Sequence, residues 1–314
     1  MLNRRILRIK VFKVLYGSVL ADCGSLAEAE SELDMSCEAT RDLYVFMLGI
    51  VSPLTRVAGE RIEMARKKFN PTEEERNPNM KFADNALARL LDEDPDFAKA
   101  FSKRKFSWEQ YDLFLKKIYS SIIQKDYYAR YMSSGQSSLA EDCRLFSRIF
   151  EEEFVDSPEL EQILEEMSIW WNDDLAYSLT YCCRTLESLA KGAGWQLPPL
   201  YQSDMKKDVK MESDRQFAHR LLQNAYAGRE RYSGMISEAV SNWDQDRIVS
   251  TDMALIITGL AEAEHFPTIP VKVTINEYVE ISKYYGTPKS SIFVNGLLDR
   301  LIQKLADEGR IRKI

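Results

Sequence analysis

Apolar side chains recur along this 314-residue chain at the spacing of an α-helix, and this pattern restricts its fold more than any other feature. Leu, Ala, Glu, Lys, Arg and Met fill most segments, whereas the Val-rich or Thr-rich alternation of β-strands is scarce. We therefore predict an all-α fold. The clearest apolar stripe consists of Val294, Leu297, Leu298, Leu301 and Leu305.

Proline and glycine divide the C-terminal hundred residues into separate helices. Pro267 and Pro270 follow one apolar segment, and Gly286-Thr287-Pro288 ends the next. We expect helices over about 214–243, 250–264 and 276–285 and a last helix capped by Ser290 or Ser291.

The N-terminal helix is expected over residues 3–21, where basic residues are interleaved with apolar ones. Arg4 and Arg8 are four apart and therefore share one side of this helix. Most of the chain between this segment and the C-terminal helices also has helical periodicity. The clearest candidate linker lies between Trp195 and Met211, at Pro198-Pro199.

Charge is distributed unevenly along the chain. The formal net charge is −7, yet the ten acidic residues and the absence of Lys and Arg over 149–183 account for more than this excess. Both chain ends are basic, so the net charge does not exclude a nucleic-acid ligand. The acidic stretch is either a docking surface for a basic partner or a solvated helical face.

No constellation of residues indicates catalysis or a cofactor. The chain lacks the common nucleotide-binding and hydrolase motifs, and only His219 and His265 are available as histidine bases or metal ligands. Its five cysteines show no zinc-ligand spacing and are expected to be reduced thiols. No uninterrupted apolar stretch approaches the roughly 18 residues of a membrane span. We predict a cytoplasmic protein that is not an enzyme and has no cofactor, metal or membrane association.

Two separated segments resemble one known family. The run IPVKVTINEYVEISK over 269–283, followed by SSIFVNGLLD over 290–299, resembles the closing signature of NusB proteins. Arg4-Arg5-Ile6-Leu7-Arg8, leading to Val14-Leu15-Tyr16, is similar to the arginine-rich first helix of that family. The resemblance implies a bundle of helices in two packed subdomains.

The resemblance covers only part of the chain. It predicts a NusB-like RNA-binding domain made of residues 1–25 and 213–314, with the family's long third helix starting at Asp214. Residues 26–212 would then be a large helical insert, a layout expected of long NusB versions from the Bacteroidetes branch. Two positions depart from the family pattern: Ile256 replaces an arginine, and Pro288-Lys289 replaces an acidic residue.

The family implies a role in antitermination of ribosomal RNA operons. NusB proteins pair with NusE, a small-subunit ribosomal protein, and hold the single-stranded leader sequence boxA in the RNA polymerase antitermination complex. A basic helix suits this task because it can contact phosphates while unstacked bases are read separately. The alternative is a helical scaffold that binds ribosome-assembly or polymerase components without touching RNA.

The candidate RNA contacts lie at both ends of the chain. Arg4, Arg5 and Arg8 are either phosphate contacts or the solvated side of a helix. Lys289, Ser290 and Ser291 lie where a helix begins, so they either bind an anion or serve ordinary capping.

The remaining candidates lie in the last helix and at the end of the family's first-helix motif. Phe293 is either a core residue or a stacking platform for a base. Asn295 and Gly296 lower helix propensity, which indicates either a polar task for Asn295 or close packing at Gly296. Asp299 extends this polar face. Asp299 and Tyr16 are candidate partner contacts, although a buried ring is the alternative for Tyr16.

Overall fold

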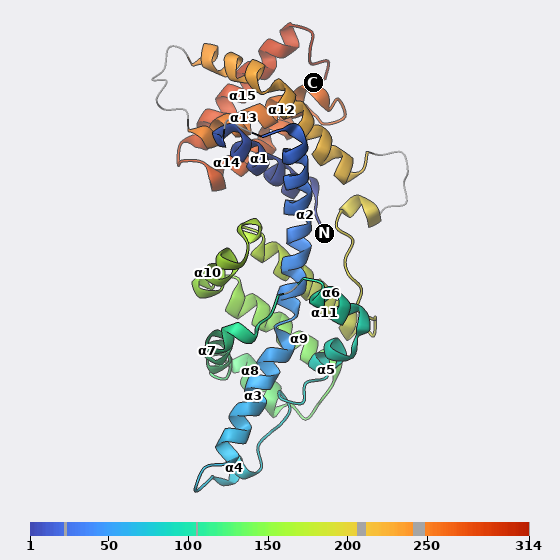
Figure 1. Cartoon of the computed structure of the whole chain (residues 1–314), viewed down its shortest axis with the longest axis vertical. Coiled ribbons are helices and arrows are strands. Elements are labelled where there is room, and N and C mark those ends of the chain that lie inside the picture. Colours follow the sequence, from blue (N-terminus) through green and yellow to red (C-terminus); the bar gives the residue numbers. More distant parts are fainter. Residues whose placement is uncertain (22–23, 105, 206–211, 241–248, 314) are drawn as a thin grey trace. The chain divides into compact units, whose positions relative to one another are not determined.

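The computed structural model describes residues 1–21, 24–104, 106–205, 212–240 and 249–313, and they are predominantly helical (Figure 1). Apart from an isolated bridge between Leu2 and Tyr201, these residues form no β-structure, so the all-α prediction is confirmed. The chain divides into unit 1 (Met1–Cys37 and Pro199–Ile314) and unit 2 (Glu38–Pro198), each with its own buried core.

Helix α13 forms the centre of unit 1. It packs against α1, α12, α14 and α15, so its side chains are buried on nearly every side. Ile256, the departure from the family arginine, is fully buried there. The helices of unit 1 are α1 (Arg4–Ala21), the first part of α2 (Leu26–Leu48), the short 3-10 helix η4 (Gln202–Met205), α12 (Asp214–Ala239), α13 (Ser250–His265), α14 (Val271–Tyr285) and α15 (Ser290–Asp307).

Two details of the C-terminal prediction are wrong. Helix α14 begins at Val271, five residues before the expected Asn276, because Pro270 occupies its N-cap, where no backbone N–H is needed. The N-cap of α15 is Lys289, whose side chain makes no capping bond. The Ser290 hydroxyl instead accepts the Thr287 backbone N–H at 2.8 Å, so it braces the preceding turn. The predicted end of the 214–243 helix lies outside the described residues.

Unit 2 contains two groups of packed helices. Helix α11 packs against α9, which continues into the π-helix η2, and α3 packs against α5 and α7. Its core is rich in aromatic rings, including Phe46 stacked on Trp108 with centroids 4.2 Å apart. Unit 2 comprises the rest of α2 with α3 (Val51–Arg66), α4 (Glu73–Arg76), α5 (Ala86–Glu93), α6 (Pro95–Ser102), η1 (Glu109–Tyr111), α7 (Asp112–Ile122), α8 (Asp126–Ser133), α9 (Leu139–Ile149), η2 (Phe150–Phe154), α10 (Pro158–Met167), η3 (Ile169–Trp171) and α11 (Leu175–Ala190).

The observed division differs from the predicted domain boundaries. One boundary falls between Pro198 and Pro199, within the predicted linker, so unit 1 begins again before residue 213. The other falls inside α2, whose first part belongs to unit 1 rather than to the predicted insert. The assignment of the two units to a NusB-like domain and an insert stays a prediction.

One segment has the length and hydropathy of a membrane span, contrary to the expectation from sequence. It lies within Leu26–Arg66, and 67% of its apolar window is buried against other helices, as in the core helix of a globular protein. Four cysteines, Cys37, Cys143, Cys182 and Cys183, are free thiols as expected, and Cys23 lies outside the described residues.

Candidate nucleic-acid interface

Helix α1 is positioned by its cap and its apolar face. The Asn3 side chain accepts the Ile6 backbone N–H at 3.0 Å and so begins the helix. Leu7, Val11 and Leu15 are buried where α1 packs against α12 and α13. The basic residues between these positions therefore point in several directions, and each has a different environment.

Arg8 is buried, which corrects its prediction as a surface phosphate contact. Its Nε and Nη2 atoms donate to the two carboxylate oxygens of Glu262 at 2.7 and 3.0 Å, and Glu262 is fully buried. Burial alone would lower the pKa of Arg8, but the hydrogen bonds and charge of Glu262 outweigh it and raise that pKa. The guanidinium is thus a structural cation that ties α1 to α13.

Arg4 lies half-buried on the same side of α1 as Arg8, as the spacing predicts. Both guanidinium groups lie over the Phe217 ring, 4.7 Å and 5.4 Å from its centroid. The Arg4 Nε also contacts the Asp214 carboxylate at 3.4 Å. Part of this guanidinium remains open to solvent, since 29% of the side chain is exposed.

Arg5 keeps the most exposed guanidinium of the three predicted arginines. It forms a two-bond pair with the Glu277 carboxylate of α14, at 2.9 and 2.8 Å, while 55% of its side chain is exposed. The hydrogen bonds from Arg5 hold the pKa of Glu277 below its ordinary value, although partial burial opposes this.

A second contact shows how α1 lies along α14. The Lys13 ammonium lies 5.3 Å from the centre of the Tyr285 ring, which also contacts Phe12. Two turns separate Arg5 from Lys13, and about two turns separate Glu277 from Tyr285, so the helices run side by side in the same direction. This brings the middle of α1, at Phe12 and Lys13, beside Tyr285 at the end of α14, directly before the Gly286-Thr287-Pro288 turn.

The three candidate residues at the start of α15 differ in their exposure. Lys289 is exposed and Ser291 is half-buried, but Ser290 is buried and donates its hydroxyl to the Asp252 carboxylate at 2.8 Å. Burial raises the pKa of that carboxyl, and its Oδ1 atom has no hydrogen-bond partner among the residues that the structure describes. A carboxylate directly behind Ser290 opposes an anion there, so we assign Ser290 a structural role.

The other predicted residues lie at or near the surface of unit 1. Asn295 and Asp299 are exposed on α15, and Phe293 is half-buried. Tyr16 is half-buried beside Phe12, with ring centroids 6.2 Å apart.

Sequence reasoning missed the carboxylates that hold α1 in place. Glu262 accepts bonds not only from Arg8 but also from the Thr274 hydroxyl at 2.8 Å and the Tyr278 hydroxyl at 3.4 Å. A single acid within the apolar run of 254–263 was the available signal, because a buried carboxylate needs a partner. Lys10 is a similar case, since its buried ammonium donates to the Ser36 carbonyl at 2.7 Å.

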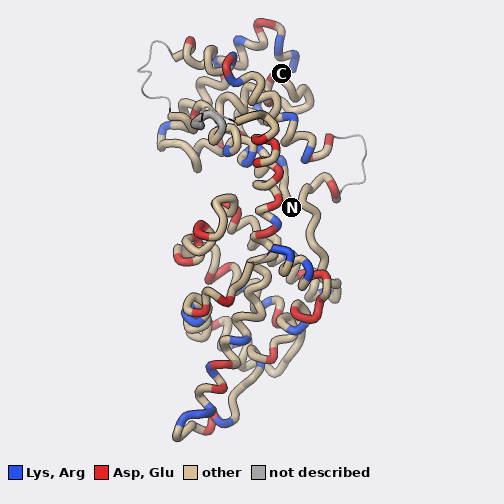
Figure 2. The backbone as a smooth tube through the Cα atoms, in the orientation of Figure 1, with Lys and Arg blue, Asp and Glu red and all other residues tan. Residues whose placement is uncertain are grey.

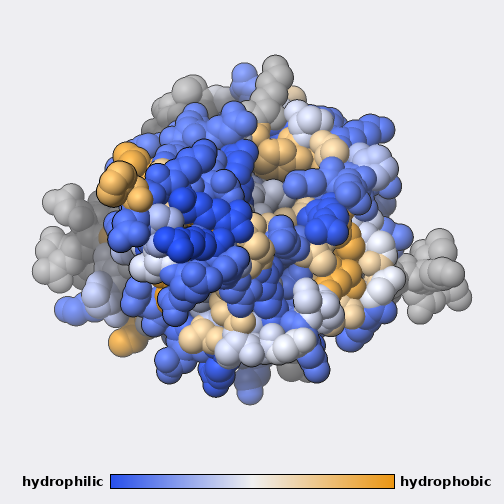
Figure 3. Space-filling model, turned by 90° about the horizontal axis from the view of Figure 1, so that it is seen from below, coloured by the Kyte–Doolittle hydropathy of each residue, from blue (hydrophilic) through white to orange (hydrophobic). Residues whose placement is uncertain are grey.

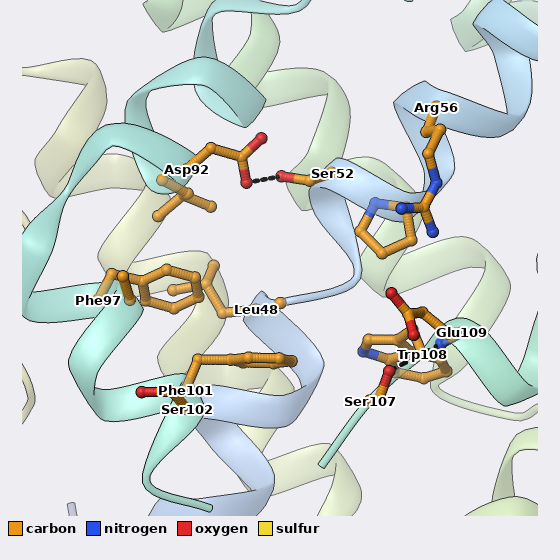
Figure 4. Close-up of a pocket in the computed structure, with 14 residues that line it drawn as sticks. Leu48, Ser52, Arg56, Asp92, Phe97, Phe101, Ser102, Ser107, Trp108 and Glu109 are labelled. Atoms are coloured by element: carbon orange, nitrogen blue, oxygen red, sulfur yellow. Dashed lines mark hydrogen bonds between the residues drawn. The ribbon is translucent and has the colours of Figure 1, made fainter. Parts of the chain in front are cut away.

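Unit 2 contains a pocket lined by aromatic and polar side chains. The pocket, of about 320 Å³, lies between α3, α6 and η1, with Phe97, Phe101 and Trp108 on its walls (Figure 4). Ser52 donates to Asp92 at 2.6 Å at its edge, and none of the lining residues is a histidine or cysteine.

Acidic residues are concentrated in one part of unit 2. Acidic residues gather along η2 and α10 (Figure 2), although Asp174 and the Glu153 side chain are buried, so 149–183 is not one solvated face. The end that carries α4 shows apolar side chains only in small separate groups (Figure 3). This visible face offers no large apolar docking patch.

Comparisons with known proteins agree with the resemblance. The NusB family model matches residues 188–303. The transcription antitermination protein NusB of Salinibacter ruber is 36% identical over 101 residues, which cover 32% of this chain and 63% of that protein. The NusB protein of Syntrophotalea carbinolica is 39% identical over 90 residues, or 29% of this chain and 58% of that protein.

The NusB protein of Alkaliphilus oremlandii is 30% identical over 93 residues, which cover 30% of this chain and 67% of that protein. The chain spans about three fifths of the length of the first two relatives. No solved structure matches it. The family match does not include α1, which joins the matched helices through its packing against α12 and α13.

Proposed function

Because this chain belongs to the NusB family, we propose that it is an RNA-binding transcription antitermination factor acting on ribosomal RNA operons. In this proposal it binds boxA-like single-stranded RNA together with NusE, as part of the RNA polymerase antitermination complex. It works in the cytoplasm and catalyses no reaction.

The observation that carries the proposal is the folding of the basic helix α1 with the family-matched helices in one unit. Arg5 and Lys289 keep their charged groups at the surface and are the proposed phosphate contacts, with Arg4 partly available. Phe293 supplies a ring for base stacking, and Asn295 supplies an amide for a base edge. Arg8 and Ser290 are not part of this surface.

The pairing of Arg5 with Glu277 does not prevent RNA binding. An exposed ion pair contributes at most about 1 kcal/mol, so a phosphate can replace the carboxylate as the partner of the guanidinium. Charge-assisted bonds from arginine to phosphate have the same two-bond geometry.

The same pairing supports a second candidate function. Arg4, Arg5 and Arg8 all have carboxylate partners within the chain, which suits a helical scaffold that binds protein components without RNA. The two candidates differ in one measurable property, since only the first requires salt-dependent affinity for RNA.

The test compares binding of labelled boxA-like RNA by the full chain at several salt concentrations, with and without NusE. Arg5→Ala and Lys289→Ala should each weaken binding and reduce the salt slope by roughly 0.7 for each phosphate that the variant no longer neutralises. Arg148→Ala is the matched control, because Arg148 is an exposed, ion-paired arginine of unit 2. If the wild-type chain binds NusE but no RNA, the scaffold is the correct function.

A further inference from the structure

The pocket of unit 2 has an apolar side built from aromatic rings. Phe97 and Trp108 are buried, and the Phe101 ring lies so close to Gly49 that a Cβ added there would collide with it. Gly49 therefore makes room for a ring that lines the pocket. The volume of about 320 Å³ is at the lower end of the roughly 300–1,000 Å³ of ligand pockets, so the pocket fits a small molecule rather than a protein segment.

The other side of the pocket carries two charges of opposite sign. Figure 4 shows the Arg56 guanidinium, from α3, and the Glu109 carboxylate, from η1, on the side away from Phe97. Both side chains are exposed, and neither charged group has an ion-pair or hydrogen-bond partner among the described residues. The Asp92 carboxylate at the pocket edge differs, because it already accepts the Ser52 hydroxyl.

A cation and an anion that remain unpaired beside an apolar wall match the groups of a zwitterion. A guanidinium donates two parallel hydrogen bonds to a carboxylate, and a carboxylate accepts hydrogen bonds from an ammonium group. A free α-amino acid carries its carboxylate and its ammonium group on one carbon, so a single molecule meets both Arg56 and Glu109. An aromatic side chain suits the other side, since contacts between rings add to the gain from apolar burial.

We propose that this pocket binds a free α-amino acid with an aromatic side chain. Arg56 binds its carboxylate, Glu109 binds its ammonium group, and its ring lies against Phe97 and Phe101. A nucleotide does not suit the pocket, because it offers no ammonium group to Glu109 and its phosphate is repelled by that carboxylate. The inference goes beyond the proposed function and uses no residue of the RNA surface.

Isothermal titration calorimetry of the full chain with L-phenylalanine tests the proposal. Three further probes each lack one of the recognised groups: hydrocinnamate has no ammonium group, phenethylamine has no carboxylate, and glycine has no ring. L-phenylalanine should bind, and each of the other probes should bind roughly tenfold more weakly, because it loses one of the three contacts.

Two substitutions test the charged residues separately. Arg56→Gln should weaken binding of L-phenylalanine and hydrocinnamate roughly tenfold but leave phenethylamine unchanged, whereas Glu109→Gln should weaken L-phenylalanine and phenethylamine but leave hydrocinnamate unchanged. Both residues are exposed, so neither replacement threatens the fold. Arg89→Gln is the matched control, because Arg89 is an exposed arginine of α5 outside the pocket. It should leave the affinity for every probe unchanged.

Failure of the wild-type chain to bind L-phenylalanine at millimolar concentrations overturns the inference. Equal affinities for L-phenylalanine and glycine overturn it as well, because the rings would then contribute nothing. L-phenylalanine binding that neither Arg56→Gln nor Glu109→Gln weakens, or that Arg89→Gln weakens equally, places the ligand outside this pocket and has the same consequence. RNA is absent from these titrations, so their outcome is separate from the test of the proposed function.

Discussion

Replacement of Arg8 by methionine should strongly destabilise unit 1. Methionine keeps the apolar stem but removes the cation. Among the described residues, the fully buried Glu262 carboxylate then keeps the Thr274 and Tyr278 hydroxyls as its hydrogen-bond donors. Removing one partner of a buried ion pair costs about 3–5 kcal/mol, a large part of the roughly 5–15 kcal/mol that stabilises a typical domain. Replacing both partners, as in Arg8→Met with Glu262→Leu, should recover most of this loss.

Arg5→Met is the matched control, because Arg5 lies on the same helix and makes the same two-bond contact with a carboxylate. Its side chain is 55% exposed, against 6% for Arg8, so the pair with Glu277 should contribute at most about 1 kcal/mol. In RNA binding the larger effect should come from Arg5→Met, whereas in stability it should come from Arg8→Met. Arg5→Met should reduce RNA affinity and its salt slope, whereas Arg8→Met should change neither at a temperature at which it is folded.

Hydrogen–deuterium exchange followed by mass spectrometry measures the stability difference. Peptides from α1 and α13 report on unit 1, and peptides from α9 and α11 report on unit 2 as an internal control. Fluorescence anisotropy with labelled RNA supplies the binding data. Equal protection of α1 and α13 in the two variants would refute the burial argument. A reduced salt slope in folded Arg8→Met would show that Arg8 contacts phosphate after all.

Three further predictions concern the same unit. Gly286→Ala should destabilise it by about 1–3 kcal/mol, because the added Cβ would lie 2.7 Å from the Ser282 carbonyl oxygen and would also contact Ser290; unchanged urea denaturation would contradict this. Ile256→Arg, which restores the family residue, should cost more than about 3 kcal/mol because the position is fully buried, and an unchanged Tm would contradict it. The pKa of Glu277 is lowered in the folded chain, so its ionised carboxylate contributes fully to stability at pH values above the ordinary glutamate pKa of about 4.3. This contribution is lost as the pH falls through the lowered pKa. Glu277→Gln should therefore be less stable at pH 7 and less sensitive to acid in denaturation curves, and equal acid sensitivity would contradict this.

Local sequence signals predicted the helices of unit 1 well. The predicted 250–264 helix starts where α13 starts and ends one residue before it, because Pro267 and Pro270 stop an apolar segment. The start of α14 was misplaced because the sequence was read as a loop up to Asn276, whereas a proline at the N-cap allows the helix to begin immediately after it. The break between α2 and α3, at Gly49 and Ile50, was not predicted, although Pro53 was its local signal: proline in the first turn of α3 has no backbone N–H to donate to the Gly49 carbonyl.

The amino-acid sequence by itself determined the helical class, the resemblance to NusB proteins and the basic character of α1, because composition, helical period and motif are properties of neighbouring residues. Only the tertiary structure decided which arginine of α1 remains at the surface. Arg5 and Arg8 are both basic residues of one motif, but their environments depend on Glu277 and Glu262, which lie more than 250 positions away along the chain. Helical spacing gives the side on which a residue lies, whereas the burial of that side and the carboxylate that meets it depend on how the distant helices pack.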